Sequence, residues 1–599
     1  MGAIVLDGGV FFRVWAPHAK AVLVSGTFNG WSRRKHELQK EPGGHWGGFV
    51  PGAGVGDEYR FRLRTARGST LWRCDPYARR VTRAGGNAVV TSRNFGWTDG
   101  GFRMPSWNEL VLYELHIGTF HRRWHEPKGT FSSAIELLPH LRQLGVNAVE
   151  LMPPFEHPGT RSWGYNPVHP YAVESSYGGP EELKFFVNEA HRHGIAVLLD
   201  VVYNHWGPMN LDLRWFDGWG YRVHGGRVHG GRRHGGIYFY PDRRRHTPWG
   251  DTRPDYRREE VRWYIRDNAL QWLEEFHVDG LRFEATAYIR NVHGHDHGPG
   301  DLPEGWSLLR WLNDEIQARQ PWKLTIAEDL RGNPLVTRPT DAGGLGFGSQ
   351  ADPEFVHPVR RVLTAARDED RHLGDLVHAL LHGFDGAAFR RVIYTESHDE
   401  VANGCARVPH EIAPGNPDDW YALKRATLGA AFLLTAPGIP MLFQGQELGL
   451  DGWFSDETPV DWSGLAKRPG IVQLYRDLIA LRRNLGGTSA GLSGPGTQIL
   501  HRHDAAKVLA YHRFHRGGSG DSVVVVTNWS AQYLRGYRLG LPFAGRWRVA
   551  FNSDSRGYHP HFGNGGPGEV WAEAISYDGQ PASAVLDLPP YTALVLVGG

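Results

Sequence analysis

Four apolar segments of this sequence end in acidic, amide or imidazole side chains. In DGLRFEAT, residues 279–286, Leu281 and Phe283 alternate with Arg282 and Glu284, which is the pattern of a buried strand that brings a guanidinium and a carboxylate together. The segments DVVYNH, TIAEDL and TESHDE end in a similar way and carry Asp200, Asn204, His205, Glu328, His398 and Asp399. Carboxylates and imidazoles gathered in one cleft can act as nucleophile, acid and base.

One acid at the end of a strand is commonly a helix cap or the partner of a cation. Four strand ends that bring such groups to one cleft favour a catalytic or binding role over a structural one. Clustered like charges cost energy, and a structural role does not explain that cost. The set suits cleavage of a glycosidic bond, in which one carboxylate attacks the anomeric carbon and a second, about 5 Å away with a raised pKa, protonates the leaving oxygen. Glu284 and Glu328 supply two carboxylates for this chemistry, and His205, His398 and Asp399 supply groups that would hold sugar hydroxyls.

The segments that carry these residues belong to an alternation of apolar strands and helices. Strands are expected within 109–120, 146–154, 195–205, 278–285, 323–330, 390–400 and 437–447, and helices within 132–145, 180–194, 258–276 and 471–484. Such an alternation predicts an α/β fold, a (β/α)8 TIM barrel over residues 106–486. Its active site is expected at the C-terminal ends of the strands.

Short runs of strand-forming residues flank the barrel on both sides. Residues 1–105 predict an N-terminal β-sandwich, and residues 487–599 predict a second all-β domain, a C-terminal β-sandwich. An insertion at 206–257 interrupts the barrel and repeats a histidine every five residues, at His224, His229 and His234. A mobile, solvated loop is favoured there over a metal site, as it is for His293, His295 and His297, so no metal is predicted.

The composition of the 599-residue chain limits which classes of molecule are expected to bind it. With 66 basic and 64 acidic residues, neither nucleic acid nor an anionic membrane is expected as the main partner. The 23 tryptophans suit flat, uncharged rings such as sugars. Two cysteines, no leader-like N-terminus and no run of 18 apolar residues predict a cytoplasmic enzyme. No organic cofactor is expected, because neither a phosphate loop nor a dinucleotide fingerprint follows a strand; the oligomeric state is left open.

DVVYNH, DGLRFEA, AED and ESHDE, in this order, resemble the four conserved regions of the α-amylase superfamily of glycoside hydrolases and transglycosylases. The resemblance covers residues 108 to about 485. The N-terminal segment is similar to the starch-binding-like sandwich that precedes the barrel in many glucan branching and debranching enzymes. An α-glucan or maltooligosaccharide substrate is implied.

The resemblance also implies a role for each site residue. It makes Glu284 the nucleophile, Glu328 the general acid/base and Asp399 the carboxylate that holds and distorts the sugar. Arg282 would keep the nucleophile ionised, Tyr165 in WGYNP would be an aromatic platform, and the sugar hydroxyls and their surroundings would be held by His205, His398, Asp200 and Asn204. Glu284 departs from the family, which has aspartate at this position, so a slow or silent member, a variant made to trap substrate, or a compensating backbone shift are all open.

Different motifs of the chain indicate two different reactions. FNGW in the first domain and SHDE in the barrel resemble 1,4-α-glucan branching enzyme, whereas VLYELHIGTF, DVVYNHWGP and AEDLRGNP resemble maltooligosyltrehalose trehalohydrolase. A branching-type transglycosylase that cuts α-1,4 bonds and forms α-1,6 links is predicted. The alternatives are the trehalohydrolase, another hydrolase of the amylase or debranching type, and a catalytically impaired glucan-binding protein.

Overall fold

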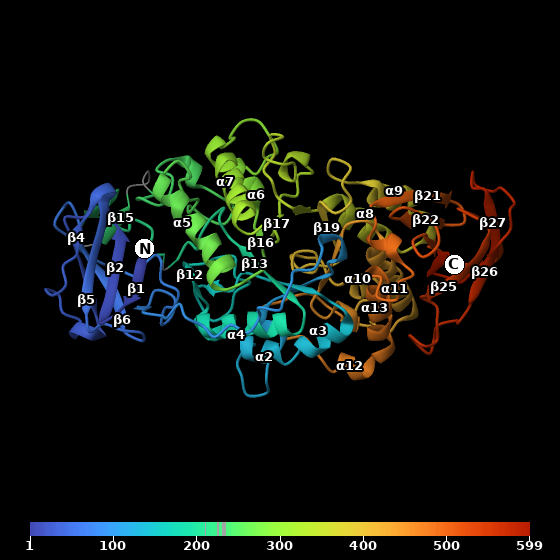
Figure 1. The fold of residues 1–599 in the computed structure, drawn as a ribbon, viewed down its shortest axis with the longest axis horizontal. Coiled ribbons are helices and arrows are strands. Elements are labelled where there is room, and N and C mark those ends of the chain that lie inside the picture. Colours follow the sequence, from blue (N-terminus) through green and yellow to red (C-terminus); the bar gives the residue numbers. More distant parts are fainter. Residues whose placement is uncertain (210, 225–226, 231–234, 599) are drawn as a thin grey trace.

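The computed structural model describes residues 1–209, 211–224, 227–230 and 235–598. The chain forms an elongated molecule in three parts, with antiparallel sheets at both ends and a barrel between them (Figure 1). The barrel is the middle part along the long axis, and it contacts both end domains.

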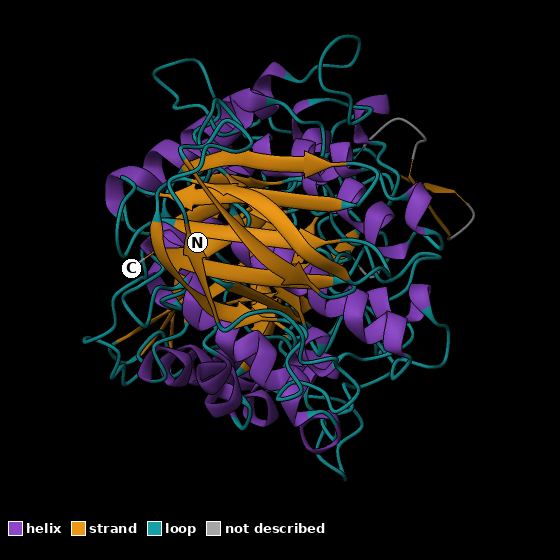
Figure 2. Cartoon of the chain, turned by 90° about the vertical axis from the view of Figure 1, so that its right-hand side faces the viewer, coloured by secondary structure: helices purple, strands orange, loops and turns teal. Residues whose placement is uncertain are grey.

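The central part is a closed barrel of eight parallel strands, as the sequence predicts. In chain order the strands are β9 (Leu112–Leu115), β10 (Ala148–Leu151), β13 (Ala196–Val201), β16 (Gly280–Phe283), β17 (Leu324–Ala327), β18 (Ser349–Ala351), β19 (Arg391–Ile393) and β20 (Ile439–Phe443). All of their residues are buried, which explains why most of these segments are largely apolar and lack a regular alternation of apolar and polar residues. In the view along the long axis, with an end domain toward the viewer, helices and loops lie around the strands (Figure 2).

β18 is the one barrel strand that the sequence does not reveal. It has three residues, two of them the polar Ser349 and Gln350. Register is nevertheless continuous, because Gln350 pairs with Ala327 of β17 on one side and with Arg391 of β19 on the other. So short and polar a strand has neither the length nor the apolar run by which strands are recognised.

The four predicted helices are present, one of them with a break, whereas the helices at 303–319, 353–364 and 420–435 were not predicted. The expected helix at 132–145 is two helices, α2 (Phe131–Ile135) and α3 (Leu138–Leu144), with Pro139 in the first turn of the second. The others are α1 (Ile117–Phe120), α4 (Gly179–Arg192), α5 (Glu259–Leu270), α6 (Thr286–Arg290), α7 (Pro303–Arg319), α8 (Pro353–Thr364), α9 (Leu373–Leu381), α10 (Val408–Ile412), α11 (Trp420–Thr435), α12 (Gly464–Lys467) and α13 (Pro469–Arg482). After α5 the chain continues as a π-helical turn, η6 (Gln271–Glu275).

The N-terminal domain is a sandwich of two antiparallel sheets. One sheet has the order β1 (Gly2–Leu6), β2 (Gly9–Trp15), β5 (His45–Pro51) and β4 (Gln39–Lys40); the other has β3 (Ala21–Gly26), β6 (Glu58–Arg64) and β7 (Thr70–Arg73), with β8 (Ala88–Val89) beside β6. Phe12 of β2 and Phe61 of β6 are fully buried between the sheets. This sandwich confirms the predicted fold of the first segment.

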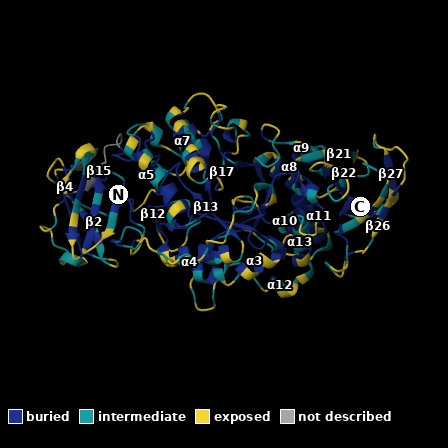
Figure 3. Ribbon diagram, in the orientation of Figure 1, coloured by how far each residue is buried: buried dark blue, intermediate teal, exposed yellow. Residues whose placement is uncertain are grey.

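The C-terminal domain is also all-β. Its larger sheet has the order β21 (Gly496–His503), β22 (Val508–Phe514), β23 (Val523–Asn528), β28 (Thr592–Gly598), β25 (Gly545–Asn552) and β26 (Glu569–Ala572), and a second sheet pairs β24 (Leu534–Leu541) with β27 (Ala582–Leu588). Buried residues lie between the sheets and in the barrel, and exposed ones follow the rim (Figure 3). The predicted boundaries near residues 105 and 486 fall between β8 and β9 and between α13 and β21, and they stay predictions.

The insertion at 206–257 differs from the loop that the sequence favours. Its strands β14 (Tyr221–His224) and β15 (Arg227–Gly230) form an antiparallel pair. Outside the insertion, β11 (Phe155–Glu156) and β12 (His169–Val173) form another such pair. His234 lies outside the described residues, so the predicted absence of a metal at the three repeated histidines stays a prediction.

The same insertion binds the N-terminal domain. Asp212 forms an ion pair with Arg60 of β6 at 2.6 Å, and Asp217 contacts the His18 ring at 2.8 Å. Arg73 of β7 donates to the backbone carbonyl of Phe216 at 2.9 Å. The insertion therefore lies between the N-terminal sandwich and the barrel and contacts both.

A buried ion pair joins the barrel to the C-terminal domain and supports a stability prediction. Lys424 of α11 contacts Asp554 at 2.7 Å, with both side chains buried. Asp554→Ala would leave the ammonium without its carboxylate, and we expect a loss of about 3 to 5 kcal/mol in the free energy of unfolding. Urea denaturation of the full chain measures it. The control Glu569→Ala removes an exposed pair with Arg546 and should cost under about 1 kcal/mol; equal midpoints for the two variants would contradict the prediction.

Candidate active site

A cleft of about 740 Å³ opens at the C-terminal ends of the barrel strands. Six of the nine site residues predicted from the sequence line it, namely Tyr165, His205, Glu284, Glu328, His398 and Asp399. The others are buried: Asp200 at the end of β13, Arg282 in β16, and Asn204 in the loop after β13. Residues up to 234 positions apart therefore meet at one site, where a barrel is expected to have its active site.

Glu284 lies directly after β16 and is held by a guanidinium. Its Oε2 accepts a hydrogen bond of 2.5 Å from Nη1 of Arg282, and the same nitrogen contacts Oδ2 of Asp200 at 2.5 Å. Burial raises the pKa of the Glu284 carboxyl above its usual value, while the charge of Arg282 opposes that shift. Arg282 thus acts on Glu284 in the predicted direction, but burial has the larger effect.

Ala285 joins the two candidate catalytic acids through its backbone. Its φ of 42° and ψ of 52° lie in the left-handed region, which is unfavourable for a residue with a Cβ. The N–H of Ala285 donates to Oε2 of Glu328 at 2.6 Å. Strained residues of this kind are found where the surrounding structure fixes a functional geometry; here the strained turn positions both Glu284 and Glu328.

Glu328, at the end of β17, has the properties of a proton donor. Burial raises the pKa of its carboxyl well above the ordinary value, and the nearby charge of Glu284 raises it further. Two interacting carboxyls lose their protons in two separate steps, so one of the pair keeps its proton to a higher pH. Because Arg282 stabilises the charge on Glu284, the proton is expected on Glu328.

His398 is held by a carboxylate that the sequence did not point out. Glu114 of β9 accepts hydrogen bonds from the His398 backbone N–H at 3.0 Å and from Nδ1 at 2.5 Å. Nε2 of His398 lies 3.4 Å from Oδ2 of Asp399. Burial alone would lower the pKa of His398, but Asp399 and Glu114 raise it to about 10, so this imidazole carries a positive charge at neutral pH. The only sequence signal for Glu114 is an acid inside the apolar run VLYEL.

The imidazole of His205 is uncharged, unlike that of His398. Burial lowers the pKa of His205 to about 4, so its imidazole is neutral. Nε2 of the ring donates to the backbone carbonyl of Tyr165 at 2.8 Å. The ring stacks on Trp249 with centroids 4.8 Å apart, and Trp249, which belongs to the insertion, is a second site residue missed by sequence reasoning. The two imidazoles of the site therefore differ, one being a cation and one a neutral donor.

Tyr165 forms a platform on one side of the cleft. Its hydroxyl donates to Oδ2 of Asp200 at 2.6 Å, and its ring stacks on the His398 ring with centroids 5.0 Å apart. The geometry suits the predicted contact of an aromatic face with a sugar.

Asn204 does not reach the cleft. It is fully buried, and neither side-chain polar atom has a hydrogen-bond partner within the described ranges. Oδ1 of Asp200 is likewise without a partner there. A supporting role for these two residues stays a prediction.

Two substitutions at Tyr165 separate the contribution of its aromatic ring from that of its hydroxyl. Tyr165→Ala removes the sugar-facing surface and should lower kcat/KM on an α-glucan by about tenfold or more. Tyr165→Phe keeps the ring and loses only the hydroxyl's bonds with Asp200 and Arg282, so its activity should fall less. Initial rates of reducing-end release measure both variants. A larger loss for phenylalanine than for alanine would show that the hydroxyl, not the ring, matters.

Two further observations concern ligands and membranes. Among the described residues, no three His, Cys, Asp or Glu side chains gather in a way that would hold a metal ion. None of the helices in the described ranges combines the length and apolar character needed to span a bilayer.

A barrel with two coupled acids at its strand ends and all-β domains on either side defines an enzyme that acts on glycosides. The alpha amylase catalytic domain matches residues 89–219 and 252–532, carbohydrate-binding module 48 (isoamylase N-terminal domain) matches 1–78, and the alpha amylase C-terminal all-beta domain matches 499–599. The chain belongs to the alpha-amylase family, whose glycoside hydrolases and transglycosylases act on α-glucans.

Curated relatives match over nearly the whole chain. The protein is 35% identical to the 1,4-alpha-glucan branching enzyme GlgB of Leifsonia xyli subsp. xyli, over 99% of this chain and 80% of that one. It is 33% identical to the enzyme of the same name from Rhodospirillum rubrum, over 100% and 81%. Among solved structures, a putative alpha amylase from Salmonella typhimurium has a TM-score of 0.72 at 23% identity, covering 100% of this chain and 99% of that one. The last similarity supports the fold alone.

Proposed function

We propose that this chain is a 1,4-α-glucan branching-type transglycosylase, which cuts an α-1,4 bond and transfers the released chain to a 6-hydroxyl. The observation that carries the proposal is the extent of the similarity: relatives named as branching enzymes align with 98 to 100% of the chain, both end domains included. The site described above contains the groups that a double displacement needs.

In the first step Glu284 attacks the anomeric carbon of the donor sugar. Glu328 transfers its proton to the departing 4-oxygen, so that the C1–O4 bond breaks and a glycosyl ester of Glu284 forms. Arg282 holds the Glu284 carboxylate in place. The cationic His398 can donate hydrogen bonds to oxygens of the sugar while positive charge develops on the sugar ring.

In the second step the proton moves the other way. The Glu328 carboxylate takes the proton of an acceptor 6-hydroxyl, whose oxygen attacks the anomeric carbon and displaces Glu284. Both acids return to their starting states. When water takes the place of the glucan hydroxyl the same step is hydrolysis, so the proposal depends on what reaches the ester first.

Proton NMR of the products tests the proposal. Amylose incubated with the protein should gain α-1,6 signals without an equal gain in reducing ends, and its iodine colour should weaken. Glu328→Gln, prepared in the same way, is the control for contaminating activity. Reducing ends without α-1,6 signals would identify a hydrolase, and free trehalose from maltooligosyltrehalose would identify a trehalohydrolase; either result would overturn the proposal.

A second candidate rests on Glu284 itself. The side chain is one methylene longer than the aspartate that the family resemblance implies, and its Oε2 is fixed by Arg282. If the extra length prevents attack, the chain binds glucan without turning it over. Amylopectin binding with unchanged reducing ends and unchanged iodine colour would favour that function.

A further inference from the structure

The interior of the barrel changes from apolar to acidic below the catalytic cleft. Apolar residues of β9, β10, β13, β17 and β20, among them Leu112 and Ala148, form one buried cluster. Side chains of opposite strands can meet in this way only inside the barrel. Side chains two positions further along a strand point to the same side, so Glu114 and Glu150 also face the interior, nearer the cleft. The register pairs Glu114 with Glu150 directly, and two buried carboxyls therefore lie side by side under the site.

Glu150 has charged neighbours on several strands. It interacts electrostatically with Glu114 of β9, Asp200 of β13, Arg282 of β16 and His398 after β19. Glu114 is hydrogen-bonded to His398, and Asp200 is hydrogen-bonded to Arg282. No hydrogen bond joins the Glu150 carboxyl to another described residue, although the residue is only 4% exposed. Within the part of the chain that the structure describes, Glu150 is thus a buried acid without a cation of its own.

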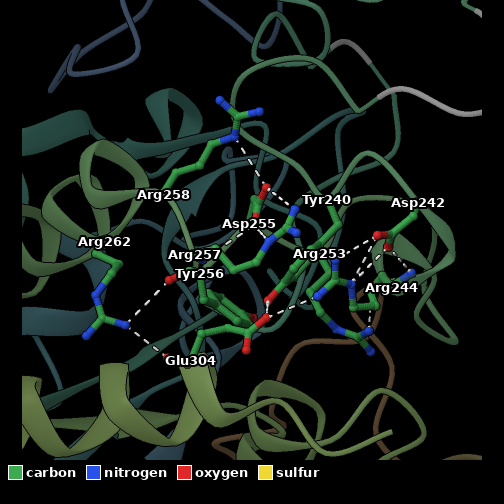
Figure 4. A network of polar contacts seen from close by, with 10 residues as sticks. All are labelled: Tyr240, Asp242, Arg244, Arg253, Asp255, Tyr256, Arg257, Arg258, Arg262 and Glu304. Carbon is green, nitrogen blue, oxygen red and sulfur yellow. Dashed lines mark hydrogen bonds and ion pairs between the residues drawn. The ribbon is translucent and has the colours of Figure 1, made fainter. Parts of the chain in front are cut away.

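Carboxylates of another network in the chain do have partners (Figure 4). Asp255, which is 1% exposed, contacts Arg257 at 2.8 Å. Glu304 accepts a hydrogen bond of 2.7 Å from the Tyr240 hydroxyl. A buried carboxyl without such a partner costs free energy when it ionises. Packing alone therefore does not explain an acid at Glu150, where an apolar side chain would cost less.

The charge of Glu150 changes with pH. Burial raises the pKa of its carboxyl to about 7, although Arg282 and His398 oppose the rise. The carboxyl is therefore neutral below about pH 7 and a carboxylate above it. Its interaction with His398 is mutual. Because the imidazolium favours ionisation of Glu150, an ionised Glu150 favours the proton on His398.

We propose that Glu150 is a positioning residue, which acts through Glu114 and His398 as a second counter-charge and keeps the proton on the His398 imidazole. Glu114 fixes the direction of the ring through two hydrogen bonds, and Glu150 maintains the charge of the ring as pH rises. This inference rests on the part of the proposed function that transfer and hydrolysis share, a cationic His398 that donates to sugar oxygens. It does not depend on whether water or a glucan hydroxyl takes the glycosyl group.

NMR titration of the His398 imidazole tests the inference on the free protein. The ring signal is assigned by its loss in His398→Asn. In Glu150→Gln the midpoint of the titration should fall by about one pH unit, the size of one charge–charge interaction inside a protein. The control Glu156→Gln removes another buried carboxyl whose pKa is raised, to about 8, and it should leave the midpoint in place. An unchanged midpoint in Glu150→Gln would overturn the inference.

The parent protein provides a measurement that needs no variant to fold. Its His398 signal should show a second, smaller inflection near pH 7, where Glu150 ionises. Glu150→Asp keeps a carboxylate under the site and should keep the high midpoint as well. If Glu150→Gln does not fold, the parent decides the inference, and a His398 signal without the inflection overturns it.

The pH profile of cleavage gives a readout that a packing role would not move. On a 4-nitrophenyl α-maltoside the leaving group needs no proton from Glu328, so loss of the His398 proton should lower kcat/KM near the pKa of His398, about 10. In Glu150→Gln this fall should begin about one pH unit lower. Rates at low pH should match the parent, because Glu150 is neutral there in both proteins. A loss by the same factor at every pH would mean that Glu150 only packs, and it would overturn the inference.

The two measurements keep this inference apart from the proposed function. If the parent forms reducing ends but no α-1,6 links, the branching function fails, while the His398 midpoint and the pH profile still decide the role of Glu150. If the parent does not turn over glucan at all, the NMR titration decides the inference by itself. A lower midpoint in Glu150→Gln supports the counter-charge in either case.

Discussion

Glu284→Asp should raise the rate of α-glucan cleavage about 100-fold, because errors of about 1 Å in the position of a reacting group cost roughly that factor. The aspartate carboxylate would lie about 1 to 1.5 Å closer to the strand. Asp200 contacts Arg282 independently of Glu284, so the guanidinium should stay in place for the shorter acid. Initial rates of reducing-end release from amylose give kcat/KM for both proteins.

The control for this prediction is Glu328→Asp. It retracts the other acid by the same length, and the resemblance gives no reason to expect a gain there, so activity should fall. Equal or lower activity of Glu284→Asp would contradict a misplaced nucleophile and would mean that the strained turn at Ala285 already compensates for the longer side chain.

Glu328→Gln should lower cleavage of amylose by about 10² to 10⁴, the usual contribution of a positioned proton donor. Glutamine keeps the shape of the side chain and the bond from the Ala285 N–H but has no proton to give. The loss should be much smaller on a 4-nitrophenyl α-maltoside, because nitrophenolate leaves without protonation. Equal losses on both substrates would argue against a role for Glu328 as acid.

The same assignment fixes the sign of the pH dependence. Glu284 must be ionised and Glu328 protonated, and burial raises the pKa of both carboxyls, that of Glu328 well above its usual value. Activity should therefore rise as pH increases through the pKa of Glu284 and fall as pH passes that of Glu328. The active range should lie above the ordinary glutamate pKa, and the high-pH limb should disappear in Glu328→Gln.

The sequence predicted most of the fold because long apolar strands and helices leave a pattern. β18 left none, since its three residues include Ser349 and Gln350 and its pairing depends on neighbours distant in the chain. The helix expected at 132–145 was broken because Pro139 begins a new first turn. Tertiary pairing in one case and local backbone chemistry in the other thus set the limits of the prediction.

Site residues that lie in motifs at strand ends were predicted from the sequence. Site residues that come from other parts of the chain were missed. Glu114 lies 284 positions before His398, to which it is bonded, and Trp249 comes from an insertion with no apolar pattern. The charge states of the imidazoles were out of reach for the same reason. Burial lowers the pKa of both imidazoles, to about 4 for His205, whereas Asp399 and Glu114 raise that of His398 to about 10. Asp399 is in the same motif as His398, but neither burial nor the position of Glu114 can be taken from the motifs.

The contacts of the insertion with the N-terminal sandwich have a consequence for exchanging modules among relatives. The segment that carries Trp249 into the cleft is the one held by Arg60 and His18 through Asp212 and Asp217. A sandwich transplanted from another member of the family would have to bring its own insertion with it, because the two surfaces fit each other. In this chain the N-terminal domain and the 206–257 segment contact each other directly, so a change on the surface of the sandwich can reach the wall of the active site.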